Sequence, residues 1–183
     1  MTPPASQAVD QGDRKGVSPF DLLFAEGEEG RILALDYGHK RVGVAVSDPF
    51  RSFAMPDVTL PNTEALFDNI LALIQEKSVV HVVVGLPLHM NGSDTEQTTL
   101  TRTFAKDLAA KNLSVSFWDE RMSSRAVERQ MLTQDASRRT RKANVDSQAA
   151  AFILQGFLDR LKSPGYRPIL IKTPHLEDTH DDL

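Results

Sequence analysis

A chain of 183 residues can build one domain with a substantial hydrophobic core and is too short for two domains of ordinary size. It contains no cysteine, which excludes disulfides, thiolate zinc sites and cysteine nucleophiles and fits a cytoplasmic location. No apolar run approaches the roughly 20 residues that span a bilayer, so we expect a soluble protein without a membrane partner.

The net charge of −4 conceals a basic central region. Residues 1–30 carry six acidic and two basic side chains, and residues 173–183 carry four acidic side chains and no basic one. Residues 31–172 hold the remaining 19 bases against 15 acids, and seven of these bases lie between Arg121 and Lys142. Such a patch suits phosphate binding, although a solvated helix face beside a basic loop would give the same pattern.

The two ends of the chain differ in composition from its centre. Residues 1–29 contain proline, glycine and scattered charge, and we expect a flexible N-terminal extension there. Residues 173–183 are expected to form a flexible acidic tail. Residues 30–172 then remain as the folded domain.

Within this domain the hydrophobic pattern changes from hairpin-linked strands to alternating strands and helices. In chain order, we predict strands at 31–37, 41–47 and 53–60, a helix at 63–77, a strand at 79–84, a helix at 95–111, a strand at 113–118, helices at 124–134 and 144–162, and a last strand at 169–171. This order predicts a mixed sheet with helices on both faces, a three-layer α/β domain.

Asp36 ends the first of these strands, immediately after an apolar run. An ionised carboxylate beside apolar packing is costly unless a cation or hydrogen-bond donors compensate it, and a metal ion is our leading explanation. Gly38 allows a tight turn into the second strand, so Asp36 is expected at the edge of a hairpin that a ligand can reach. Bonding to the amides of that turn is the alternative.

Two further acids lie where a buried element meets a polar edge. Asp119 and Glu120 end a predicted strand and face opposite sides, so only one of them can share a face with a given ligand. Asp146 is expected in the first turn of a helix, on the buried face, where it could simply favour the helix N-terminus. Glu120 could likewise form a surface ion pair with Arg121 or Arg125.

Taken together, Asp36, Glu120 and Asp146 would repel one another unless cations neutralised them. Hard carboxylate oxygens suit Mg²⁺ or Mn²⁺, and two such ions can clamp an in-line phosphoryl displacement. Asn91 and the backbone of its loop could bind a phosphate, although a connection ending in a helix cap at Ser93 or Asp94 fits equally. His81, within a strand, is expected to be a packed core residue.

The chain resembles the YqgF family of RNase H-like nucleases, also called the RuvX or Holliday junction resolvase family. Four segments in family order carry this resemblance: residues 36–48 (DYGHKRVGVAVSD), 84–93 (VGLPLHMNGS), 118–124 (WDERMSS) and 141–159 (RKANVDSQAAAFILQGFLD). The resemblance implies an RNase H-like fold and phosphodiester hydrolysis that depends on divalent metal ions. It assigns the metal-binding and catalytic roles to Asp36, Glu120 and Asp146.

Within this family, relatives are assigned to maturation of the 5′ end of pre-16S ribosomal RNA, which we take as the expected function. Cleavage of four-way DNA junctions, assigned to other relatives, is the alternative, and symmetric cutting would suggest a homodimer. An ATP-binding module and a non-catalytic nucleic-acid-binding protein are alternatives of another class. Phosphate contacts are expected from one group of polar and basic side chains: Lys40, Arg41, Asn91, Arg121, Arg125, Arg138, Arg139, Arg141 and Lys142.

Overall fold

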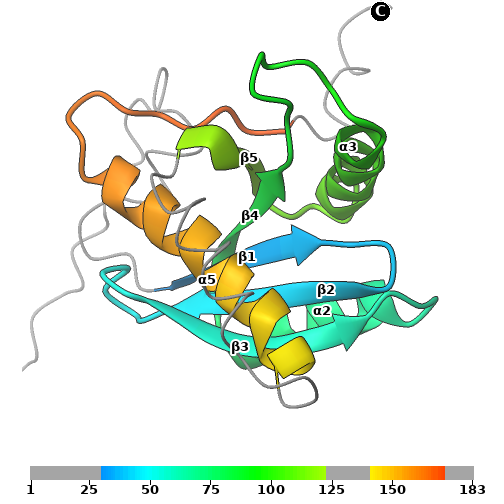
Figure 1. The fold of residues 1–183 in the computed structure, drawn as a ribbon. Helices are drawn as coiled ribbons and strands as arrows, with labels where there is room; N and C mark the ends of the chain where they lie inside the picture. Colours follow the sequence, from blue (N-terminus) through cyan, green and yellow to red (C-terminus); the bar gives the residue numbers. More distant parts are fainter. Residues whose placement is uncertain (1–29, 123–140, 172–183) are drawn as a thin grey trace, which may run out of the picture.

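The computed structural model describes residues 30–122 and 141–171, and a five-stranded sheet lies at its centre (Figure 1). The strands are β1 (Arg31–Tyr37), β2 (Arg41–Ser47), β3 (Ala54–Pro61), β4 (Val79–Leu86) and β5 (Val115–Asp119). Their order across the sheet is β3-β2-β1-β4-β5. β2 runs antiparallel to its neighbours β1 and β3, whereas β4 is parallel to β1 and β5 is parallel to β4. The predicted mixed sheet is thereby confirmed.

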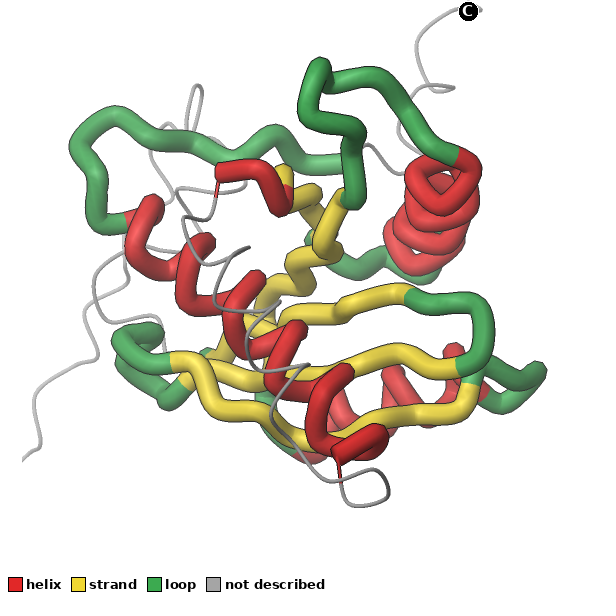
Figure 2. Tube along the Cα trace, viewed as in Figure 1, coloured by secondary structure: helices red, strands yellow, loops and turns green. Residues whose placement is uncertain are grey.

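Helices cover both faces of this sheet, as Figure 2 shows with α5 crossing in front of the strands. The helices are α2 (Leu66–Glu76), α3 (Glu96–Ala109) and α5 (Arg141–Leu161), with a short 3₁₀ helix, η1, at Glu120–Met122. The buried residues form one cluster that includes side chains of α2 and α3 and a second that includes side chains of α5. The three-layer α/β/α arrangement is that of an RNase H-like domain, as expected.

The central position of β1 explains its unbroken apolar run. Leu33 and Leu35 belong to the cluster under α2 and α3, whereas Ile32 and Ala34 belong to the cluster under α5. Because side chains alternate along a strand, a strand covered on both faces needs apolar residues at every position. The same alternation directs Asp36 toward the α5 face.

Several predicted boundaries were wrong. α5 begins at Arg141, not near residue 144, so Asp146 lies beyond the first turn, where the helix dipole acts most strongly. Thr95 caps α3 instead of Ser93 or Asp94, in a reciprocal capping box with Thr98. The strand predicted at 169–171 is a single bridge between Ser116 and Leu170.

The N-terminal extension (1–29), the acidic tail (173–183) and the helix predicted at 124–134 fall outside the described residues. No helix of the described part is long and apolar enough to cross a membrane.

His81 is buried in the core, as predicted. Its two ring nitrogens lie 2.9 Å from the hydroxyl oxygens of Ser114 and Ser116, and its ring stacks on Phe157 of α5. Burial, assisted by the positive charge of Arg51, lowers the pKa of His81 to about 3. The imidazole is therefore neutral at physiological pH and serves the packing under α5.

Candidate active site at the carboxyl end of β1

Asp36 lies between two glycines of the neighbouring strands. It pairs with Gly43 of β2, and continuing the β1–β4 register one residue past Leu35 and Val84 places it beside Gly85 of β4. Alternation puts all three residues on the α5 face, because Ala34, Ala45 and Val83 on the same strands belong to the cluster under α5. The half-buried Asp36 is thus flanked by positions that carry no side chain.

The first of these glycines brings Asp146 close to Asp36. A Cβ at Gly43 would overlap the carbonyl oxygen of Asp146 and would lie 3.0 Å from the amide nitrogen of Ser147. The backbone of α5 therefore rests directly on the strand residue that pairs with Asp36. Any larger residue at position 43 would push this part of the helix away from the sheet.

The second glycine gives Glu120 its place. A Cβ at Gly85 would lie 2.8 Å from the Oε1 atom of Glu120 and would also overlap the Ile153 side chain of α5. The Glu120 carboxylate therefore lies over the β4 position next to Asp36. β5 ends at Asp119 and η1 begins at Glu120, so a change of backbone direction separates the two acids.

Asp119 makes a different set of contacts. Its carboxylate accepts hydrogen bonds from the backbone amide and the guanidinium of Arg121, with an Nη2–Oδ2 distance of 2.6 Å. The side-chain hydrogen bond from Arg121 is the main cause that lowers the pKa of Asp119, although burial opposes it. Of the two acids that end β5, Glu120 lies toward Asp36 and Asp119 is bound to Arg121.

Arg121 also holds the loop between β4 and α3. Its Nη1 atom donates to the carbonyl oxygen of Met90 at 3.3 Å, and a Cβ at Gly92 would lie 3.0 Å from the same nitrogen. The side chain of Asn91 accepts hydrogen bonds from the amide and hydroxyl of Ser93 within this loop. Both residues were expected to contact phosphate, and in the structure both order the loop beside Glu120.

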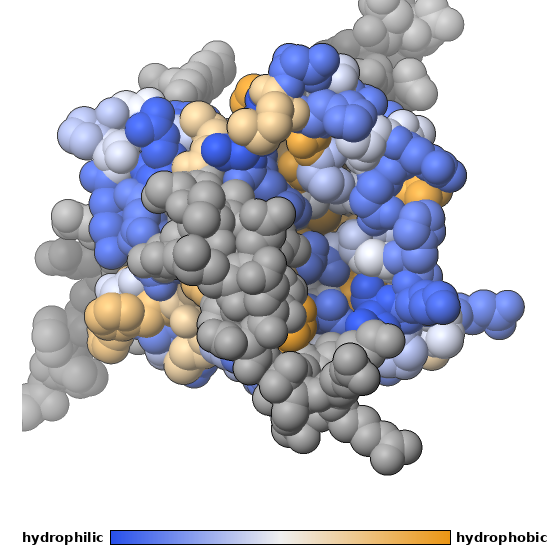
Figure 3. Space-filling view, in the orientation of Figure 1, coloured by the Kyte–Doolittle hydropathy of each residue, from blue (hydrophilic) through white to orange (hydrophobic). Residues whose placement is uncertain are grey.

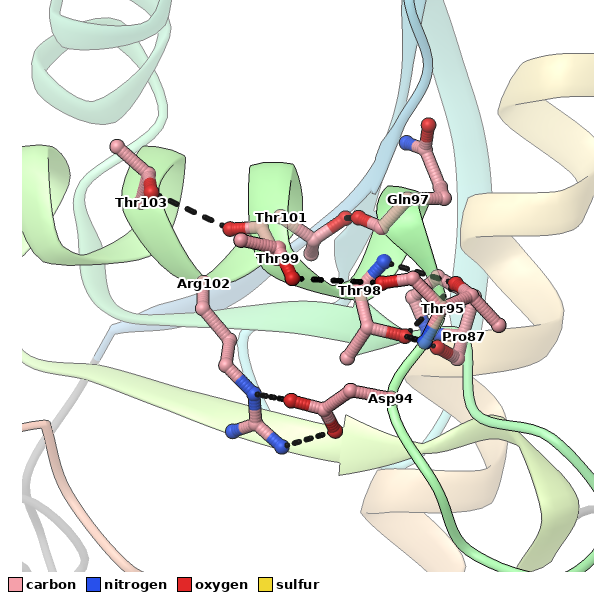
Figure 4. A network of polar contacts seen from close by, with 9 residues as sticks. All are labelled: Pro87, Asp94, Thr95, Gln97, Thr98, Thr99, Thr101, Arg102 and Thr103. Atoms are coloured by element: carbon pink, nitrogen blue, oxygen red, sulfur yellow. Dashed lines mark hydrogen bonds and ion pairs between the residues drawn. The ribbon is translucent and has the colours of Figure 1, made fainter.

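The amino end of α3 supports this loop and the β1–β2 hairpin. Figure 4 shows the hydroxyl of Thr98 donating to the carbonyl oxygen of Pro87, next to the Asp94–Arg102 ion pair. Gln97 donates to the carbonyl oxygen of Tyr37 at 2.8 Å, and Asn62 donates to that of Gly38 at the same distance. The backbone just after Asp36 is therefore held by two side chains from elsewhere in the chain.

Arg41 binds one of the three acids directly. Its Nε atom donates to Oδ2 of Asp146 at 2.7 Å, which joins residues 105 positions apart. Arg41 shares the α5 face with Gly43 by alternation. The carboxylate of Asp146 is thus bound to a guanidinium at the edge of the glycine-flanked site.

The other predicted phosphate contacts are only partly described. Lys40 is exposed in the β1–β2 hairpin. Arg125, Arg138 and Arg139 lie outside the described residues. Arg141 and Lys142 belong to the first turn of α5, but only their backbone is described. The structure therefore places Lys40 and Arg41 near Asp36 and leaves the larger basic patch untested.

The residues around Asp36 fit a divalent cation by the chemistry of their oxygen donors. All three acids offer the hard oxygen donors that Mg²⁺ and Mn²⁺ prefer. Because Gly43 and Gly85 carry no side chains, the backbone of Asp146 and the carboxylate of Glu120 can lie over the strand positions beside Asp36. Among residues 30–122 and 141–171, however, no three acidic or histidine side chains lie close enough together to hold a metal ion. Asp146 is bound to Arg41 instead.

Sequence reasoning missed the part played by Gly43 and Gly85. Each interrupts a run of apolar residues, in Val-Gly-Val and in Val-Val-Gly-Leu. A glycine inside a strand often marks a place where another backbone or a ligand comes close. That signal was available, but it could not tell which segment of the chain approaches.

Comparisons with known proteins identify the family of this chain. The family model described as "RuvX: Holliday junction resolvase" matches residues 30–160. This chain belongs to the RuvX family. A relative from Sphingopyxis alaskensis named "Putative pre-16S rRNA nuclease" is 49% identical over 143 residues, which cover 77% of this chain and 94% of the relative. A relative of the same name from Bradyrhizobium sp. (strain ORS 278) is 44% identical over 146 residues, covering 76% and 91% of the two chains.

The matched region of this RuvX-family chain contains Asp36, Glu120 and Asp146, as well as both glycines of the site. Among solved structures, T. thermophilus RuvC in complex with a Holliday junction aligns with a TM-score of 0.48 at 11% identity. That alignment covers 76% of this chain and 99% of RuvC and is too distant to indicate function.

Proposed function

We propose that this RuvX-family chain is a nuclease that depends on divalent metal ions and processes the 5′ end of pre-16S ribosomal RNA. The names of the relatives support the reaction and the substrate. The observation that carries the proposal is the position of Asp36 between Gly43 and Gly85, with the backbone of Asp146 over one glycine and the carboxylate of Glu120 over the other. The nuclease domain would comprise residues 30–172, in the cytoplasm.

In this proposal Asp36, Glu120 and Asp146 hold Mg²⁺ or Mn²⁺. A pair of such ions supplies an activated water for attack on phosphorus and stabilises the leaving oxygen. The protein contributes the rigid placement of the acids, since Asp36 is fixed within the sheet and Asp146 by α5 resting on Gly43. Lys40, Arg41 and the basic residues between Arg121 and Lys142 would bind the phosphates that flank the cleaved bond.

Branched DNA is the second candidate substrate, because the matching family model is described as a Holliday junction resolvase. Both substrates present closely spaced phosphates, and a site built from carboxylates does not distinguish ribose from deoxyribose. Symmetric cleavage of a four-way junction would need two active sites and therefore a homodimer.

One preparation tested on precursor ribosomal RNA and on a synthetic four-way junction decides between the two. We expect cleavage of the RNA at the 5′ side of the 16S sequence, its loss on chelation, and its return with Mg²⁺ or Mn²⁺. Asp36→Asn, Glu120→Gln and Asp146→Asn should each lower the rate about a hundredfold or more and leave the fold intact. Asp107→Asn, at an exposed position on α3, serves as the control.

Full activity in all three site variants would contradict the assignment. Preferential cleavage of the junction by the same preparation would select the alternative substrate.

A further inference from the structure

We propose that Arg41 regulates occupancy of the metal site by competing with the cation for Asp146. The inference rests on the proposed function and concerns the order in which the site assembles. Without metal, Arg41 neutralises Asp146. When the cation binds, Asp146 turns to it, and the released guanidinium becomes available to a substrate phosphate.

The contact that carries this inference is the hydrogen-bonded ion pair between Arg41 and Asp146. Nε of Arg41 lies 2.7 Å from Oδ2 of Asp146. An arginine at this distance engages one oxygen of the Asp146 carboxylate and offsets its negative charge, so the guanidinium and a metal ion compete for the same carboxylate. Because the Arg41 guanidinium is positively charged and lies next to Asp146, it also repels a divalent ion that approaches this carboxylate.

Solvent exposure makes the exchange feasible. The side chains of Arg41 and Asp146 are 39% and 25% exposed, so water and a hydrated ion can reach the pair. Exposed ion pairs contribute little net stability, which means that a metal ion bound also by Asp36 and Glu120 can displace the guanidinium. A deeply buried pair would resist such displacement.

Geometry restricts the motion to side chains. The backbone of Asp146 packs against Gly43, and the backbone of Arg41 belongs to strand β2. Both backbones are therefore held in place. Rotation of two side chains is enough to exchange the partner of Asp146. The backbone of Arg41 stays at the site, because its carbonyl oxygen accepts the hydrogen bond from the Gly38 amide that closes the hairpin.

The test measures Mn²⁺ binding to the full chain without substrate, by calorimetry or by the resonance signal of free Mn²⁺. We expect Arg41→Ala to bind Mn²⁺ about three- to tenfold more tightly than the wild type, because the competitor and its charge are gone. Arg41→Lys keeps a cation and should return the affinity toward the wild-type value. Cleavage by Arg41→Ala should nevertheless fall, since the phosphate contact is lost.

Arg102→Ala is the matched control. Arg102 also forms an ion pair with an aspartate, Asp94, and its side chain is 38% exposed, close to the value for Arg41. The control removes the same charge from a pair that lies outside the glycine-flanked site, and it should leave Mn²⁺ affinity unchanged. Thermal unfolding without metal verifies that each variant is folded.

A double variant separates competition at Asp146 from a general effect of charge. In an Asp146→Asn background, Arg41→Ala should lose most of its effect on Mn²⁺ affinity. The inference is overturned if Arg41→Ala binds Mn²⁺ with unchanged or weaker affinity, or if the gain persists in full without Asp146. Absence of Mn²⁺ binding and of cleavage in the wild type would instead overturn the proposed function itself.

Discussion

The α-carbon of Gly43 lies so close to Asp146 that a side chain at position 43 would overlap the carbonyl oxygen of Asp146. Gly43 is also the cross-strand partner of Asp36. This one contact therefore sets the distance between two acids that lie on different elements and far apart in the sequence.

Gly43→Ala is expected to lower the free energy of unfolding by about 1–3 kcal/mol, since the added methyl group must displace the backbone of α5. The rate of cleavage should fall about tenfold or more, because even a small displacement of the Asp146 carboxylate from its place beside Asp36 slows the reaction strongly. Chemical unfolding and initial rates on the same preparation measure both effects.

Gly165→Ala provides the control for this variant. Gly165 has a φ of +77°, and among the described residues its absent Cβ would have no neighbour within 4 Å. Alanine there costs about 1–2 kcal/mol through backbone strain alone. It should therefore reduce stability without reducing the rate, and equal loss of activity in the two variants would argue against a positional role for Gly43.

Arg121 is expected to act through Asp119 and the β4–α3 loop. Asp119→Asn and Arg121→Gln should each reduce stability slightly, and the double variant should reduce it little more than either single variant. An arginine that bound phosphate independently would give additive losses in a binding titration with the RNA substrate. Additivity there would show that Asp119 does not position Arg121.

His81 makes stability depend on pH. Burial lowers its pKa to about 3 in the folded chain, against the ordinary value of 6.5 that we take for the unfolded chain. Between these two values the unfolded chain binds one proton more than the folded chain. The contribution of neutral His81 to the free energy of unfolding is complete above pH 6.5. As the pH falls below that value, the free energy of unfolding decreases by up to about 1.4 kcal/mol per pH unit.

Urea unfolding between about pH 7.5 and pH 5 tests this dependence. The slope of unfolding free energy against pH should be smaller in His81→Asn than in the wild type, whatever the absolute stability of the variant. An unchanged slope in His81→Asn would show that His81 is not the group responsible.

Asp48 is expected to stabilise the β2–β3 loop and not the reaction. Its carboxylate accepts backbone hydrogen bonds from Phe50, Ser52 and Phe53 at 2.7–3.0 Å. Burial alone would raise its pKa, but these hydrogen bonds outweigh that effect and hold the pKa below the usual value. Asp48→Ala should destabilise the fold by about 1–3 kcal/mol, and circular dichroism during thermal unfolding measures the loss.

The rate of cleavage should stay unchanged in Asp48→Ala, because this loop lies at the opposite end of β2 from Gly43 and Asp36. The loop carries the exposed rings of Phe50 and Phe53, where Figure 3 shows hydrophobic surface at the lower left. A rate that fell together with stability would indicate that the loop contributes to substrate binding.

Much of the fold could be predicted because it follows local rules. β1 and β2 were predicted at 31–37 and 41–47 and occupy these residues, since their apolar runs and the turn at Gly38 leave few alternatives. Helix ends were less well predicted. α3 is capped at Thr95 because the hydroxyl groups of Thr95 and Thr98 each accept a hydrogen bond from the backbone amide of the other residue. Ser93 and Asp94 are also residue types that cap helices, so residue type alone did not identify the cap.

The sequence by itself determined that acids end buried elements and that basic residues gather beside them. Only the tertiary structure decided which charges meet. Arg41 binds Asp146 across 105 residues, Arg121 binds Asp119, and Glu120 reaches the space over Gly85. The reason is physical: an ion pair or a glycine contact depends on strand register and on how α5 rests on the sheet, and no periodicity in the chain encodes the distance between two elements.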